Sequence, residues 1–190
     1  MTAGSRNVAE VSHEGLRRFF AGMVHPSFAT LGLGVGDTSR YVTEMLARFA
    51  RSDQLYRVRD SRGRRLETVT ELLMELMEQW TGSEEGYRFE REIDLRRHCG
   101  DFALFMSGVF RAHVEGEAYL SYYLTEGAAS YRVVGDRLQL MGDRRSEMFR
   151  SMAEHFEAVS GALDYMRKVY MVPAARSGPY AGVLRGFDLN

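Results

Sequence analysis

The chain contains little cysteine and little proline. Cys99 is the single cysteine, which excludes an intrachain disulfide and any cysteine-rich zinc site. The three prolines leave the interval from Ser27 to Val172 uninterrupted, and long helices are compatible with such an interval because proline is the residue that breaks them. A net charge of −1 gives no reason to expect a nucleic-acid partner.

Long hydrophobic runs are also missing. The longest nearly apolar stretch, Phe102–Phe110, is about half as long as a membrane-spanning helix requires. The first residues show no basic segment followed by an apolar run, as a signal peptide would. With 190 residues, 45% of them hydrophobic, the chain can bury a core as one domain. We therefore expect a soluble, cytoplasmic protein without a membrane span.

Apolar residues recur at helical spacing along most of the chain, and this periodicity predicts an all-α fold. Two segments carry heptad-like seams in which apolar or small residues alternate at spacings of three and four. The seams consist of Leu120, Leu124, Gly127, Tyr131, Val134, Leu138 and Met141, and of Phe149, Met152, Phe156, Val159, Leu163, Met166 and Tyr170. Short connections between such helices favour antiparallel neighbours. We predict three long antiparallel helices at about 87–110, 117–141 and 144–170.

Shorter N-terminal helices are expected to pack against these three, which gives a helical bundle of about six helices. The first should run from Val8 to Val24 and end at His25–Pro26, because proline disfavours helical backbone in the residue before it. At most a minor hairpin is expected near residues 55–66. Residues 171–190 should form a poorly structured or surface-laid tail of this single domain, 1–190.

The helix predicted at 87–110 carries an unusual polar stripe, Asp94, His98 and Asp101, at spacings i, i+4 and i+7. His98 and Asp101 are the candidates for catalytic acid–base residues. A metal site would need further ligands from facing segments, and His113, Glu117 and His155 are the candidates. The alternative is a docking role, in which the stripe binds an arginine, a tyrosine or a helix end on a neighbouring element.

Three other features admit both a structural and a functional interpretation. Cys99 falls on the apolar face, where a thiol resists ionisation, so we expect a structural cysteine. Tyr123, Gly127 and Tyr131 stack along one helix, and the gap at Gly127 can receive either a ligand or an aromatic side chain from a neighbouring helix. A basic segment with five arginines, Arg57, Arg59, Arg62, Arg64 and Arg65, is either a solvated turn or a partner-contact patch.

These observations favour a non-catalytic helical protein that acts through protein–protein interaction or homodimerisation, with a small apolar ligand as a further option. The alternative is a metal- or haem-dependent bundle enzyme that uses the Asp94, His98 and Asp101 stripe. A weaker alternative is anion or nucleic-acid contact through Arg57–Arg65. No cofactor is favoured.

Overall fold

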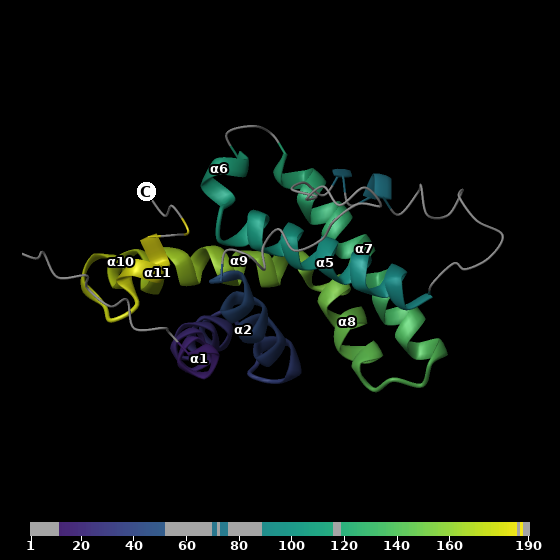
Figure 1. The fold of residues 1–190 in the computed structure, drawn as a ribbon, viewed down its shortest axis with the longest axis horizontal. Helices are drawn as coiled ribbons and strands as arrows, with labels where there is room; N and C mark the ends of the chain where they lie inside the picture. Colours follow the sequence, from purple (N-terminus) through teal and green to yellow (C-terminus); the bar gives the residue numbers. More distant parts are fainter. Residues whose placement is uncertain are drawn as a thin grey trace, which may run out of the picture.

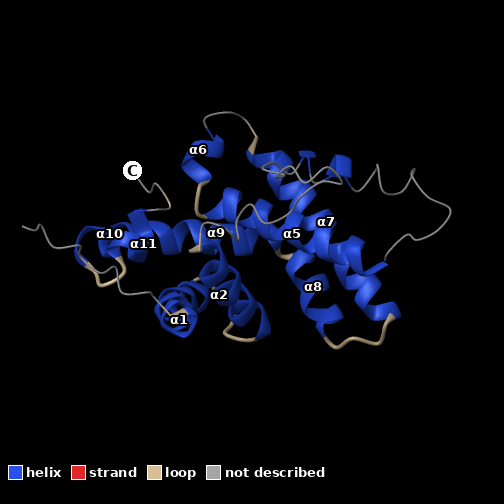
Figure 2. Cartoon of the chain, viewed as in Figure 1, coloured by secondary structure: helices blue, strands red, loops and turns tan. Residues whose placement is uncertain are grey.

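The computed structural model describes residues 12–51, 70–71, 73–75, 89–115, 119–185 and 187, without the side chains of His113 and Glu115. Residues 70–71 and 73–75 are helical. The other elements are α1 His13–Thr30, α2 Asp37–Phe49, α5 Phe89–Gly108, α6 Arg111–Glu115, α7 Leu120–Leu140, α8 Arg145–Glu154, α9 Phe156–Met166, the π-helical η1 Arg167–Met171, α10 Val172–Ser177 and α11 Ala181–Arg185. The described residues contain no strand, as Figure 2 shows. The predicted all-α helical bundle is confirmed, and the hairpin predicted near 55–66 lies outside the described residues.

The centre of the bundle is formed by α5, α7, α8 and α9 (Figure 1). Helix α7 packs against α5 and then reverses into α8 through a short connection. Gly142 lies in that connection with a φ of +69°, a left-handed conformation that glycine adopts without strain. The seam residues Tyr131, Val134 and Leu138 are buried on α7 and face the core, as the heptad spacing predicts.

The helix predicted at 144–170 is divided in the structure. Helix α8 ends at Glu154, His155 has a φ of −108° and a ψ of 21°, and α9 begins at Phe156. Figure 1 shows that the chain changes direction there, so that α8 lies along α7 while α9 runs beneath α5. The His155 ring nitrogen Nδ1 and the His155 amide both lie within 3.0 Å of the Ser151 carbonyl oxygen. The periodicity continues through this bend, which is why the sequence pattern predicted one helix.

The first helix extends further than predicted. Helix α1 continues through Pro26 to Thr30 instead of ending near Val24. Proline removes the backbone hydrogen bond to the Gly22 carbonyl, and the Ser27 hydroxyl donates a separate hydrogen bond to the Met23 carbonyl at 2.7 Å. Phe28 is 1% exposed, and its burial offsets the local cost of proline. The connection that follows places Gly32 and Gly34 at positive φ before α2.

Residues near the C-terminus form short helices and contribute to the core, where the sequence predicted a poorly structured or surface-laid tail at 171–190. Helices α10 and α11 follow η1, and Leu184 is fully buried. The ring of Phe187 contacts Phe20 and Phe105, with centroid separations of 6.3 and 5.4 Å. None of the described helices combines the length and the apolar character that crossing a membrane requires.

Candidate functional site

Asp101 of α5 is fully buried and lies at the junction of three helices. Its Oδ1 atom accepts hydrogen bonds from the hydroxyls of Tyr41 on α2, at 2.6 Å, and Tyr131 on α7, at 2.8 Å. Its Oδ2 atom accepts a hydrogen bond from the Arg48 guanidinium on α2, at 2.9 Å. We call these four residues the Asp101 cluster. A buried carboxylate is tolerated only with such partners.

The local sequence explains how these partners reach Asp101. Tyr41 and Arg48 are seven residues apart on α2, so they lie on the same face two turns from each other. Tyr131 lies over Gly100, where an added Cβ would be only 2.5 Å from two carbons of the tyrosine ring. Gly100 is therefore required for the close approach of α5 and α7. The Tyr41 and Tyr131 rings meet edge to face, with centroids 6.3 Å apart.

The electrostatics of the cluster favour neutral phenols and a charged arginine. Burial raises the pKa of Tyr41 and Tyr131 well above the ordinary value for tyrosine, and the charge of Asp101 raises both further. Burial is the largest single effect on Arg48 and opposes its ionisation, but the Asp101 charge and hydrogen bond, together with the two nearby tyrosines, outweigh it and raise the pKa of the guanidinium. The hydroxyls remain donors, so the cluster acts as a clamp between α2, α5 and α7.

The raised tyrosine pKa gives the cluster a defined pH dependence. Below pH about 10 both the folded and the unfolded chain keep Tyr131 protonated, so its contribution to stability is constant. Above that pH the unfolded chain ionises first, and stability should fall by up to about 1.4 kcal/mol per pH unit for this tyrosine. In Tyr131→Phe this loss is absent, so the stability gap between wild type and variant should narrow from pH 10 to 11 in urea unfolding. A gap that stays constant would contradict the assignment.

The predicted Asp94, His98 and Asp101 stripe does not form one polar site, because its members have different environments. Asp94 is exposed and forms an ion pair with Arg97 at 2.8 Å. His98 is fully buried, and its ring lies edge to face with Phe49 at a centroid separation of 6.0 Å. Asp101 follows the docking alternative, since its partners are tyrosines and an arginine.

The other predicted metal ligands do not complete a site among the described residues. His155 is exposed at the bend between α8 and α9. His113 lies in α6, but its side chain is outside the description, as is the whole of Glu117. Within the described part of the chain, no group of three or more His, Cys, Asp or Glu side chains is arranged to hold a metal ion. The Arg57–Arg65 segment also lies outside the described residues.

Phe156 occupies the gap at Gly127, which is one of the two alternatives that the sequence left open. A Cβ on Gly127 would lie 2.1 Å from the Phe156 Cζ atom. The Phe156 ring also contacts the ring of Tyr131, at a centroid separation of 5.6 Å. Tyr123 is half-buried, and its ring contacts the ring of Tyr122.

Cys99 lies in the core, two residues before Asp101, and is fully buried. Burial raises the pKa of its thiol to about 11. At neutral pH the group therefore remains a thiol, which is neither a nucleophile nor a good metal ligand. The structural interpretation made from the apolar face agrees with this environment.

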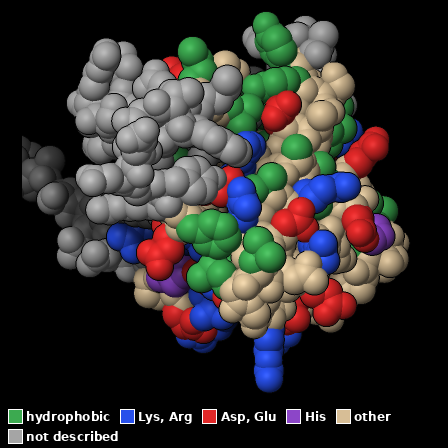
Figure 3. Space-filling view, turned by 90° about the vertical axis from the view of Figure 1, so that its right-hand side faces the viewer, with side chains coloured by type: hydrophobic (Ala, Val, Ile, Leu, Met, Phe, Trp, Pro, Cys, Tyr) green, Lys and Arg blue, Asp and Glu red, His purple; other side chains and the backbone are tan. Residues whose placement is uncertain are grey.

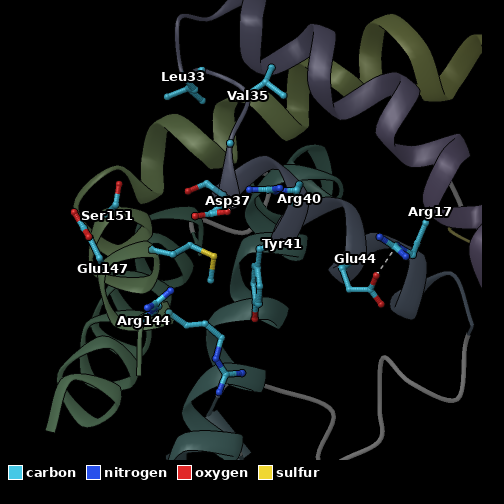
Figure 4. A pocket seen from close by; sticks show the side chains of 15 residues that line it. Arg17, Leu33, Val35, Asp37, Arg40, Tyr41, Glu44, Arg144, Glu147 and Ser151 are labelled. Atoms are coloured by element: carbon cyan, nitrogen blue, oxygen red, sulfur yellow. Dashed lines mark hydrogen bonds and ion pairs between the residues drawn. The ribbon is translucent and has the colours of Figure 1, made fainter. Parts of the chain in front are cut away.

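The ring of Tyr41, a member of the cluster, lines a groove of about 770 Å³ between the start of α2 and α8 (Figure 4). One wall comes from the connection before α2 and from α2 itself, and the other comes from α8. Its lining includes Leu33, Val35, Asp37, Arg40, Tyr41, Glu44, Arg17, Arg144, Arg145, Glu147, Met148 and Ser151. The ring of Tyr41 lines the groove, while its hydroxyl reaches down to the buried Asp101. We call this feature the α2–α8 groove.

Several charged side chains of the groove are held by neighbours. Arg17 pairs with Glu44 at 2.9 Å, and Arg40 pairs with Asp37 one turn away. No pattern in the sequence predicted this groove, since it depends on how α1, α2 and α8 meet. The one signal was the Leu31–Gly36 connection, whose alternating glycines place Val35 at 56% exposure on the surface.

A second, smaller opening of about 290 Å³ lies between α5 and the α7–α8 connection. Leu140 and Met141 next to it are 76% and 55% exposed. Figure 3 shows the face on this side of the molecule, where hydrophobic side chains are interspersed with charged ones.

Comparison with protein-family models, curated proteins and solved structures found no match. Function must therefore be argued from the geometry of the chain itself.

Proposed function

We propose that this protein acts by binding, and that it holds a small amphipathic ligand in the α2–α8 groove. The observation that carries the proposal is the attachment of the groove wall to the Asp101 cluster through Tyr41. A wall that is fixed before binding loses little conformational entropy when the ligand arrives, and such preorganisation increases affinity. The volume of about 770 Å³ falls in the range typical of small-molecule sites.

The lining supports an amphipathic ligand rather than a purely apolar one. Leu33, Val35 and Met148 provide apolar contacts, and arginines and carboxylates surround them. A non-catalytic role fits the two stripe carboxylates, because Asp101 is committed to Arg48 and Asp94 to Arg97. We also propose, as the sequence predicts, that the protein is soluble and cytoplasmic.

A groove variant tests the proposal. Val35→Glu places a charge in the apolar part of the lining at an exposed position, so we expect the fold to be retained. Small amphipathic molecules that raise the thermal unfolding temperature of the wild type should lose most of that effect in Val35→Glu. Val169→Glu is the matched control, since Val169 is 42% exposed and does not line the groove. Stabilisation that persists in Val35→Glu would place binding elsewhere.

A second candidate is contact with a protein partner or a second copy of the chain. The exposure of Leu140 and Met141 at the tip of the α7–α8 connection favours it. Light scattering of the wild type and of Leu140→Glu would test this proposal. A larger species that dissociates in the variant supports it, and a monomer in both samples contradicts self-association.

A further inference from the structure

The charged residues of the α2–α8 groove are not equally satisfied. Arg17, Arg40 and Arg145 each have an acidic partner, namely Glu44, Asp37 and Asp143. In the part of the chain that the structure describes, the side chain of Arg144 forms no hydrogen bond or ion pair. It lies on the α8 wall of the groove, opposite the wall that carries Tyr41 (Figure 4).

Glu147 is the other charged residue of the groove that forms no ion pair in the described part of the chain. Its surroundings, however, already stabilise its negative charge. It lies in the first turn of α8, where the positive end of the helix dipole stabilises a carboxylate. Arg144 immediately precedes that turn, where the same dipole disfavours a cation. Among the described residues that line the groove, Arg144 is therefore the cation without an acidic partner, whereas the helix already stabilises the charge of Glu147.

Apolar lining lies within the same groove as Arg144. Met148 is one turn along α8 from Arg144, and Leu33 and Val35 lie on the facing connection. A guanidinium binds carboxylates and phosphates through two parallel hydrogen bonds, which favours an anionic group over a neutral polar one. The groove therefore offers one anchor for an anion and an apolar surface for the rest of the molecule.

We propose that the ligand of the α2–α8 groove is an organic anion, with its anionic group on Arg144 and its apolar part against Met148, Leu33 and Val35. This inference rests on the proposed binding function and specifies the chemical class of its ligand. The anchor is an electrostatic one, so anion binding weakens as salt concentration rises.

Three probes with the same octyl chain separate charge from apolar contact: octanoate, 1-octanol and octyltrimethylammonium. Calorimetric titration of the wild type should give the tightest binding for octanoate, roughly tenfold tighter than for 1-octanol. Arg144→Gln should lower the affinity for octanoate by roughly tenfold, to the level of the alcohol, and leave the alcohol unchanged. Arg150→Gln is the matched control on α8, because Arg150 pairs with Asp136 and does not line the groove.

The outcomes distinguish the two proposals. Suppose that 1-octanol or octyltrimethylammonium binds as tightly as octanoate and that Val35→Glu abolishes this binding. The ligand would then not be specifically an anion, but the groove would still be a binding site. Octanoate binding that is unchanged in Arg144→Gln would also overturn the anionic anchor. If none of the three octyl probes binds, or if Val35→Glu affects none of them, both proposals fail. If ligand-free Arg144→Gln unfolds at the same temperature as the wild type, its lower affinity for octanoate is not caused by a loss of folding.

Discussion

Asp101→Asn is expected to lower the free energy of unfolding by roughly 2–4 kcal/mol. Removing one partner of a buried ion pair typically costs about 3–5 kcal/mol, and the loss here should be somewhat smaller because the Arg48 side chain remains 25% exposed to solvent. The substitution keeps the shape of the side chain but removes the negative charge of the carboxylate. That carboxylate accepts hydrogen bonds from Tyr41, Tyr131 and Arg48. Urea unfolding at neutral pH measures the change.

Asp94→Asn is the matched control, because Asp94 lies two turns earlier on the same helix. Its ion pair with Arg97 is exposed, and exposed pairs contribute about 0–1 kcal/mol. We therefore expect a change below about 0.5 kcal/mol. If the two substitutions lowered the free energy of unfolding equally, Asp101 would not differ from a surface carboxylate. The Asp101 cluster would then not act as a clamp between α2, α5 and α7.

Gly127→Ala is expected to destabilise the fold by roughly 1–3 kcal/mol, although alanine is the better helix former. The added methyl group would overlap the ring of Phe156, whose Cζ atom lies 2.1 Å from the ideal Cβ position. Phe156 is 3% exposed and packs against Tyr131, so its ring has little room to move. Thermal or urea unfolding gives the comparison with the wild type.

Gly161→Ala is the control for helix propensity. Gly161 lies inside α9, and an added Cβ would meet no atom within 4 Å. Alanine should therefore stabilise the chain by up to about 1 kcal/mol there. The opposite signs at the two glycines separate close packing from propensity. Stabilisation by alanine at position 127 would show that Phe156 is not fixed in the gap between α7 and α9.

The helical seams were predictable because they depend only on spacing. Tyr131 and Val134 on α7, and Phe149 and Phe156 beyond the connection, are buried where the heptad pattern places them. The predicted end of the first helix at Pro26 was wrong. The cost of proline in α1 is local, while the burial of Phe28 depends on tertiary packing, which the sequence does not show. The bend at His155 has no proline or glycine beside it, so no local signal marked it.

The candidate site was only partly predictable for a similar reason. Helical geometry placed Asp101 on a polar stripe and left a metal site and a docking role as alternatives. The answer, Tyr41 and Arg48 from α2 and Tyr131 from α7, requires the arrangement of three helices. The α2–α8 groove likewise arises where separate elements meet, and no sequence spacing within one helix predicts it.

The most direct measurement of the link between Asp101 and the groove wall is a double-mutant cycle of Tyr41→Phe and Asp101→Ala, followed by urea unfolding. Tyr41 donates to Asp101 at 2.6 Å, and a hydrogen bond to a charged group contributes about 1.5–3 kcal/mol. The loss caused by Tyr41→Phe should therefore be at least about 1 kcal/mol smaller when Asp101 is already alanine. If the two losses instead add to within about 0.5 kcal/mol, Asp101 does not hold Tyr41, and the groove wall is not fixed by the buried cluster.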